Sequence, residues 1–292
     1  MWSIFIMCKQ WLGKASSLII AKRISHYSKN SVFHKGGPTM LNYEVYTGTN
    51  NRWVVFLHGI GGSVKTWKKQ LDAFKEYNVI LIDLPGHGKS KSDKHITIPA
   101  VNEYIKEVLD HFHISKVDIV ALSLGTLVAI HFALKYPERV NSLVLGGSII
   151  NIDGMYKNAM KFTYACKKIV PYKFLYRILA KVILPKRNHK RSRMIFIRES
   201  LHMSREMFFS WLKYTMQILH SEEIIAKLKT LKVKLCFISG SEDRCFLSGT
   251  ARCVRELENS TFRVIKNCGH VCSIERANEF NALALDFLAQ PA

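Results

Sequence analysis

The chain lacks any apolar run of the length that a membrane-spanning helix requires, about 18 to 20 residues. Its hydrophobic residues, 48% of 292, are distributed in shorter runs. A transmembrane protein is therefore not expected. A chain of this length can form one large domain with a substantial core, and it shows no internal repeat or low-complexity linker that would indicate two.

Cysteines with metal-binding or disulfide spacing are also missing. The seven cysteines are scattered at positions 8, 166, 236, 245, 253, 268 and 272. They show neither paired ligand spacing nor the framework of a small secreted protein. We therefore expect reduced thiols, no metal site and a cytoplasmic protein.

Negative charge is scarce in two segments. Residues 1–40 hold six Lys or Arg and no Asp or Glu, and residues 151–230 hold 17 against five. These segments carry 18 of the 21 excess positive charges, and the rest of the chain is nearly neutral. Such a surface can attract anionic lipids, nucleic acid or acidic ligands, or it can serve solubility alone. Nucleic acid is not expected, because the charge is not joined to a recognised nucleic-acid module.

Residues 1–39 form a basic and apolar extension before the main domain, 40–292. No positive residue precedes its apolar run and no convincing cleavage site follows, so a secretory signal is not indicated. An amphipathic helix with Trp2 and Trp11 at an anionic membrane surface would make the protein peripheral at the membrane. The alternatives are a poorly ordered leader and a true translation start at Met40.

From residue 41 onward, apolar patterns typical of strands and helices alternate. The expected strands are 41–46, 53–57, 77–84, 117–121, 140–145, 233–238 and 261–265, and the expected helices are 65–76, 98–112, 124–136, 248–257 and 273–288. Strands that are continuous apolar runs between helices indicate an α/β fold with a mostly parallel sheet and helices on both faces. Ligands of such sheets bind outside the carboxyl ends of the strands.

Residues from about 151 to 228 interrupt this alternation. They hold helix-spaced apolar and aromatic residues and no clear strand, which predicts an inserted helical lid. Three aromatic residues, Trp67, Phe208 and Trp211, are candidate substrate contacts, although packing between helices is the alternative for the lid positions. The basic run 186–193 could face a membrane or an anionic substrate, or form a solvated turn.

A serine with small residues two positions away on either side lies between an expected strand and an expected helix. In this setting, Ala121-Leu122-Ser123-Leu124-Gly125 can expose the serine hydroxyl at the end of the sheet. Small residues are needed because the strained turn brings the helix close to the strand. An ordinary helix start is the alternative interpretation.

A serine hydroxyl becomes a good nucleophile only beside a base that a carboxylate orients. Asp243 and His270 each follow a later expected strand, which places them at the same edge as Ser123. The chain order Ser, Asp, His is that of a nucleophile-elbow hydrolase. Glu242 and Asp153 are alternative acids.

Two backbone N–H groups are candidates for an oxyanion hole. Leu124 follows the serine at the helix start, and Gly59 permits a turn that aims the Ile60 N–H inward. We expect His58 and His87 to structure their loops rather than to act as bases.

Five segments together resemble the α/β-hydrolase superfamily, in its single-domain type with a helical cap: 57–59, 83–90, 121–125, 240–243 and 269–270. The resemblance covers about residues 41–292. It implies that Ser123 is the nucleophile, His270 the general base and then acid, and Asp243 its orienting partner. It also implies that Ile60 and Leu124 are the oxyanion donors.

Ala121 stands where this superfamily usually has glycine, a change that the family tolerates. The serine argues against the epoxide hydrolase and haloalkane dehalogenase branches, which use aspartate at that position. We expect a serine hydrolase that cleaves carboxylic esters with apolar acyl or alkyl groups through an acyl-enzyme, without a cofactor. The alternatives are a carbon–carbon bond hydrolase, a thioesterase or lysophospholipase, and a non-catalytic ligand-binding protein.

Overall fold

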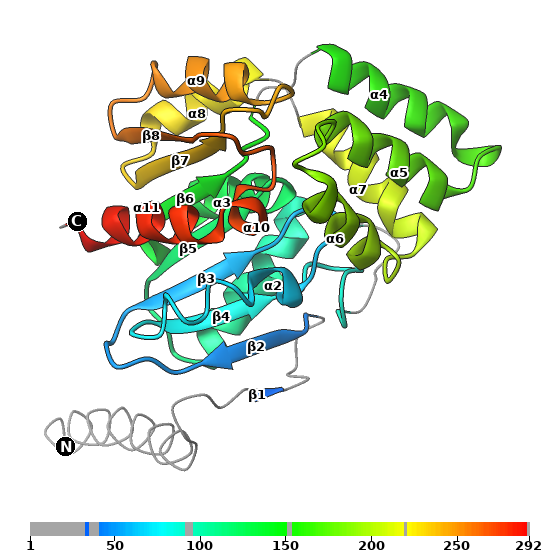
Figure 1. Cartoon of the computed structure of the whole chain (residues 1–292). Coiled ribbons are helices and arrows are strands. Elements are labelled where there is room, and N and C mark those ends of the chain that lie inside the picture. Colours follow the sequence, from blue (N-terminus) through cyan, green and yellow to red (C-terminus); the bar gives the residue numbers. More distant parts are fainter. Residues whose placement is uncertain (1–32, 35–40, 91–95, 151–153, 219–220, 291–292) are drawn as a thin grey trace, which may run out of the picture.

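A single sheet organises the computed structural model, which describes residues 33–34, 41–90, 96–150, 154–218 and 221–290 (Figure 1). The strand order is β1-β2-β4-β3-β5-β6-β7-β8. The strands are β1 (Phe33–His34), β2 (Tyr43–Tyr46), β3 (Trp53–Leu57), β4 (Asn78–Ile82), β5 (Val117–Leu122), β6 (Val140–Gly146), β7 (Lys234–Gly240) and β8 (Ser260–Ile265). The β1–β2 and β2–β4 pairs are antiparallel. Every other pair along this strand order, from β4 to β8, is parallel, which confirms the predicted α/β class.

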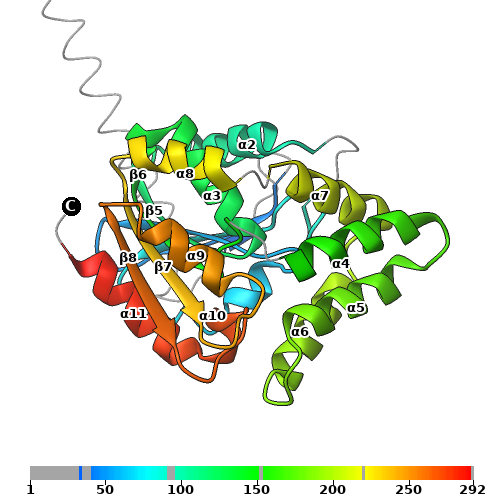
Figure 2. The same cartoon turned by 90° about the horizontal axis from the view of Figure 1, so that it is seen from above.

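Helices cover both faces of the sheet (Figure 2). On one side lie α2 (Ile98–His111), α3 (Leu124–Lys135) and α8 (Ser221–Thr230), and on the other lie α10 (Cys272–Glu275) and α11 (Ala277–Ala289). α9 (Leu247–Val254) packs against β7 and β8. Covering on both faces explains why every residue of β5 is buried and why all of them except Asp118 are apolar.

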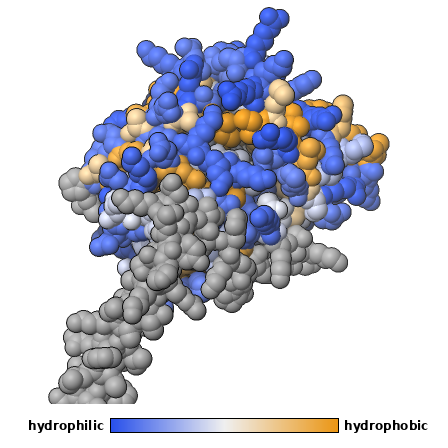
Figure 3. Space-filling model, turned by 60° about the horizontal axis from the view of Figure 1, so that its bottom comes forward, coloured by the Kyte–Doolittle hydropathy of each residue, from blue (hydrophilic) through white to orange (hydrophobic). Residues whose placement is uncertain are grey.

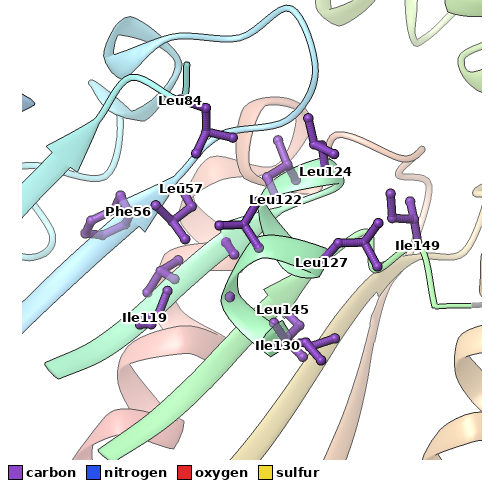
Figure 4. Packing of buried hydrophobic residues seen from close by; sticks show 14 of the residues in the cluster. Phe56, Leu57, Leu84, Ile119, Leu122, Leu124, Leu127, Ile130, Leu145 and Ile149 are labelled. Atoms are coloured by element: carbon purple, nitrogen blue, oxygen red, sulfur yellow. The ribbon is translucent and has the colours of Figure 1, made fainter. Parts of the chain in front are cut away.

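Helix α3 packs against β3, β5 and β6 in the core (Figure 4). A Cβ atom on Gly125 would lie 2.2 Å from the carbonyl oxygen of Leu57, so only glycine lets α3 approach β3 this closely. This approach holds the start of α3, and with it Ser123, at the carboxyl end of the central strand.

Four helices between β6 and β7 form the cap: α4 (Gly154–Ala165), α5 (Tyr172–Ile183), α6 (Lys190–Ser200) and α7 (Arg205–Ile218), with the short η3 (Cys166–Lys168). The cap lies beyond the carboxyl ends of the strands in both views (Figures 1 and 2). The expected lid, 151–228, also included most of α8. That helix instead lies over the sheet beside α3 (Figure 2). The charges of its Lys227 and Glu223 are close enough to influence the pKa of His131 in α3.

Two expected helices differ from those observed. Residues 65–76 form the 3-10 helix η1 (Val64–Trp67) followed by turns, because the side chain of Gln70 is buried and donates to the carbonyl of Ser273. The three- and four-residue spacing of Trp67, Gln70 and Phe74 fits tight turns as well as it fits an α-helix. The last expected helix is interrupted at Arg276, whose backbone angles are φ −129° and ψ 56°.

Most of the expected extension 1–39 lies outside the described residues. Its two described residues form β1, at the edge of the sheet beside β2. None of the described helices combines the length and the apolarity that crossing a bilayer requires.

Candidate active site

Ser123 occupies a strained turn between β5 and α3. Its backbone angles, φ 53° and ψ −117°, lie in a region that residues with a side chain rarely adopt. The turn is held by the Ser123 N–H, which donates to the Gly146 carbonyl at 2.9 Å. A Cβ atom on Gly59 would lie 3.1 Å from the Cβ of Ser123, so glycine there leaves space in front of the hydroxyl.

The serine begins a continuous relay of hydrogen bonds. Its Oγ lies 2.8 Å from His270 Nε2, and His270 Nδ1 lies 2.8 Å from Asp243 Oδ2. Because an ionised carboxylate only accepts, the Nδ1 atom carries the proton and Nε2 is free to accept one from the serine. All three side chains are buried, and they come from the loops after β5, β7 and β8.

Glu242, the neighbour of Asp243, has a different set of partners. It accepts from Lys186 at 2.6 Å and from Asn188 at 2.7 Å, and it lies 2.8 Å from His189. The bond from Lys186 is the largest cause that lowers the pKa of Glu242 to about 2. Glu242 is thus an ionised partner of the cap rather than of His270, and the other alternative acid, Asp153, lies outside the described residues.

The expected oxyanion donors belong to two segments, the start of α3 and the loop after β3. Leu124 is the first residue of α3, and N–H groups in the first turn of a helix have no acceptor within it. The Ile60 loop turns at Gly61, which has a φ of 72°, and the Ile60 carbonyl accepts from the Tyr176 hydroxyl of the cap at 3.0 Å. The cap therefore helps to fix the loop that holds the second donor.

His58 and His87 are fully buried beside this loop. Burial lowers the pKa of His58 to about 4 and that of His87 to about 3. His58 Nδ1 donates to the Gly59 carbonyl at 2.8 Å, and its Nε2 accepts from the Leu84 N–H at 3.0 Å. His87 Nδ1 lies 3.1 Å from the Pro85 carbonyl, to which it donates. These contacts match the loop-structuring role that we predicted for both residues.

Aromatic rings pack beside His270. The ring of Phe246 lies 4.6 Å from that of His270, and Tyr156 of α4 lies 5.0 Å from Phe246. Burial raises the pKa of Tyr156 well above its usual value, so its hydroxyl stays protonated. Neither ring was predicted; the available signal for Phe246 was its place three residues after Asp243.

The three predicted substrate contacts lie in different surroundings. Trp67 packs in the core with its ring 5.0 Å from Phe56, and no described contact joins it to the relay. Phe208 packs within the cap on Tyr176, which itself reaches the Ile60 loop. Trp211 spans from cap to core, because its Nε1–H donates to the Pro85 carbonyl at 3.1 Å.

A buried histidine joins the cap to the loops that follow β7 and β8. His189, just before α6, lies 2.8 Å from Glu242 and 3.7 Å from Glu275. We call the group of Lys186, Asn188, His189, Glu242 and Glu275 the cap latch. Sequence patterns gave no sign of it, because its members are brought together only by tertiary packing.

Glu275 also holds the loop that carries His270. Its carboxylate accepts the N–H of Gly269 at 3.0 Å and that of Val271 at 3.3 Å, on either side of His270. A Cβ atom on Gly269 would lie 2.9 Å from both His189 and Glu275, so the latch closes tightly over this loop.

A family model described as alpha/beta hydrolase fold matches residues 52–277, so the chain belongs to this family. A hydrolase of 2-hydroxy-6-oxononadienedioate and 2-hydroxy-6-oxononatrienedioate from Paraburkholderia phymatum is 30% identical over 285 residues, covering 88% of this chain and 93% of its own. A protein of the same name from Escherichia coli K12 is 28% identical, covering 84% and 89%.

Solved structures show the same fold at lower identity. A 2-hydroxy-6-oxo-6-phenylhexa-2,4-dienoate hydrolase from Rhodococcus superposes with a TM-score of 0.72 at 19% identity, covering 89% of this chain and 99% of its own. An enol-lactonase from Burkholderia xenovorans superposes with a TM-score of 0.72 at 20% identity, covering 86% and 96%. The chain is a hydrolase of the α/β-hydrolase fold.

Proposed function

We propose that Ser123, His270 and Asp243 are a catalytic triad that breaks the carbon–carbon bond beside the ketone of a 2-hydroxy-6-oxo-dienoate. The observation that supports the chemistry is the relay of two 2.8 Å hydrogen bonds that ends at the serine hydroxyl. The substrate class rests on the relatives at 30% and 28% identity, whose names state hydrolysis of such compounds.

The first step forms a bond from Ser123 Oγ to the ketone carbon while the serine proton moves to His270 Nε2. The buried carboxylate of Asp243 stabilises the imidazolium that results. The ketone oxygen becomes an oxyanion, and the N–H groups of Ile60 and Leu124 are its proposed donors.

Collapse of this intermediate breaks the carbon–carbon bond. The substrate reacts as its 2-oxo tautomer, in which the 2-hydroxyl proton has been lost to water and carbon 5 has gained one. Carbon 5 therefore keeps the electron pair of the broken bond, the conjugated 2-oxo group delocalises it, and the resulting dienolate takes the proton from His270. A water molecule, deprotonated by His270, then hydrolyses the acyl ester on Ser123. The free acid leaves and the serine hydroxyl is restored, so the atoms and protons balance within the triad, the substrate and water.

Hydrolysis of carboxylic esters with apolar acyl groups is the second candidate. Phe246 and Tyr156 place apolar ring faces beside His270, which suits an apolar acyl group. A dioate, in contrast, needs hydrogen-bonded or cationic partners for its carboxylates once they are buried. The same triad steps apply to an ester, with an alkoxide as the leaving group.

Steady-state kinetics with both substrate classes tests the proposal. We expect wild-type protein to hydrolyse 2-hydroxy-6-oxononadienedioate with a higher kcat/KM than p-nitrophenyl esters of any acyl length. Ser123→Ala should lower both rates at least about 10³-fold, because the acyl-enzyme cannot form. The matched control is Ser115→Ala, at an exposed position, which should change neither rate.

Faster turnover of esters would assign the second candidate instead. Wild-type protein that hydrolyses neither class, or Ser123→Ala protein that remains fully active, would contradict the triad mechanism.

A further inference from the structure

Several large apolar side chains at one end of the cap are exposed to solvent. Ile169 is 85% exposed, Phe162 58%, Phe174 56% and Leu201 45%. These four residues, which we call the cap tip, are the majority of the exposed large apolar side chains among the described residues. Exposed apolar residues are ordinary when scattered singly, but a group of them marks a surface that something else covers.

Local structure brings three of the four together. Phe162 lies in the last turn of α4, Ile169 directly follows η3, and Phe174 lies in the first turn of α5. The turn between the two helices is closed by the N–H of Ile169, which donates to the Cys166 carbonyl at 3.0 Å. The connection between α4 and α5 is at the end of the cap away from the sheet (Figures 1 and 2).

Contacts with the turn between α6 and α7 extend this surface. The Tyr172 hydroxyl donates to the Met203 carbonyl at 2.7 Å, and Arg205 donates to the Lys167 carbonyl at 2.6 Å. Leu201, two residues before Met203, therefore belongs to the same end of the cap. Figure 3 shows hydrophobic atoms in small groups among hydrophilic ones on one face of the molecule, including its right-hand end, where the cap lies.

The charges around the cap tip are mostly positive. Exposed lysines alternate with the exposed apolar residues: Lys161 beside Phe162, Lys168 beside Ile169 and Lys173 beside Phe174. Lys167 lies in η3 and Arg205 is the first residue of α7. Glu206 is an acidic neighbour whose charge, after burial, raises the pKa of Tyr172. Long lysine side chains can keep their ammonium groups in water while the apolar neighbours leave it.

We propose that the cap tip docks on the surface of an anionic phospholipid membrane. Phe162, Ile169 and Phe174 enter the interface between headgroups and acyl chains, where apolar side chains gain by leaving water. Lys161, Lys168 and Lys173 then face the lipid phosphates, whose negative potential attracts basic residues near the surface. This docking is independent of the proposed catalytic activity.

Vesicle co-sedimentation with the full chain tests the proposal. One set of vesicles holds phosphatidylcholine and phosphatidylglycerol in equal parts, and the other holds phosphatidylcholine alone. We expect binding to the anionic vesicles only, weakened by added salt because screening shortens the reach of the charges. Ser123→Ala protein should bind as wild type does, which separates docking from catalysis.

Two double variants locate the contact. Ile169→Asn with Phe174→Ser, and separately Lys168→Gln with Lys173→Gln, should each lower the partition coefficient about tenfold or more. The matched controls change exposed residues of the sheet domain: Val264→Asn for the apolar pair, and Lys232→Gln with Lys266→Gln for the basic pair. We expect both controls to bind as wild type does.

Three results would overturn the proposal: equal binding to both kinds of vesicle, unchanged binding by both cap-tip variants, or no binding by wild type. A wild-type dimer in solution that the Ile169→Asn, Phe174→Ser variant converts to a monomer would instead assign the tip to contact between two copies of the chain. Because all of these positions are exposed, the thermal midpoints of the variants should stay close to that of wild type.

Discussion

The protonation states of single residues around Ser123 follow from their burial and from their partners. His58 and His87 stay neutral at ordinary pH because their rings are shut away from water, whereas Glu242 stays charged because Lys186 reaches it. His270 differs from the other two histidines, since a buried carboxylate accepts from it on one side and a serine hydroxyl lies on the other. The base of the proposed triad is thus distinguished by its partners, not by its burial.

The neutral state of His87 predicts how stability depends on pH. An unfolded histidine binds a proton near pH 6.5, whereas folded His87 binds one only near pH 3, so its contribution is complete above pH 6.5 and is lost as the pH falls toward 3. His87→Asn keeps a donor for the Pro85 carbonyl but removes the titration. We expect this change to flatten the slope of unfolding free energy against pH by up to about 1.4 kcal/mol per unit.

Urea unfolding at a series of pH values measures this slope. His202→Asn, at an exposed position, is the control and should keep the wild-type slope. An unchanged slope for His87→Asn as well would show that His87 does not resist protonation in the folded state.

The residues that could be predicted from the sequence are those whose roles follow from their place after a strand. Ser123, Asp243 and His270 each follow a strand in the parallel part of the sheet, so their meeting follows from topology. Phe246 could not be predicted to cover His270, since the contact depends on the path of the loop after Asp243. Trp67 was expected near substrate, but an aromatic residue in a short turn gives no sign that it faces the core.

Elements place these residues by approaching one another closely. Helix α3 lies near β3 because Gly125 has no side chain, and the elbow at Ser123 depends on that approach. Strands β3, β5 and β6 could be predicted almost to the residue, because apolar residues dominate each of them. The 65–76 segment could not, because tight turns and a helix bury the same positions.

Gly125→Ala tests the close approach of helix and strand. The new methyl group would meet the Leu57 carbonyl, so α3 must shift, and we expect a loss of about 1–3 kcal/mol in unfolding free energy together with reduced turnover. Gly154→Ala is the control, since a Cβ there meets nothing within 4 Å. Equal stability of the two variants, measured by urea unfolding, would mean that the space beside Leu57 is not needed.

The cap latch links an element of the cap to the loop of His270, the proposed base. Glu275→Gln leaves one carbonyl oxygen to serve the N–H groups of Gly269 and Val271, and it removes the charge that faces His189. We expect kcat to fall about tenfold with little change in KM, because Glu275 positions His270 rather than substrate. Glu279→Gln, at an exposed position of α11, is the control.

Steady-state kinetics of the two variants at one pH gives this comparison. A raised KM with an unchanged kcat in Glu275→Gln would assign Glu275 to substrate binding, and equal kinetics in both variants would remove any role for the latch.

In the whole molecule, the sheet and the cap form different parts of the candidate site. The sheet brings the three triad residues to one edge, and the cap lies over that edge with its helices held to the loops of Ile60, Pro85, Glu242 and Glu275. The α/β architecture could be predicted because alternating apolar runs allow few arrangements. The substrate could not, because it depends on how side chains of the cap and the sheet meet, and helix spacing alone does not distinguish packing residues from pocket residues.

The central claim is that Ser123 is the nucleophile of this site. Intact-protein and peptide mass spectrometry after treatment with a fluorophosphonate tests it most directly. That reagent phosphonylates the activated serine of a triad with loss of fluoride, and its use needs no knowledge of the substrate. We expect a single adduct on the peptide that contains Ser123, none in Ser123→Ala protein, and much slower labelling when His270→Ala removes the base. Labelling of another residue, or a wild-type Ser123 that stays unmodified, would contradict the account.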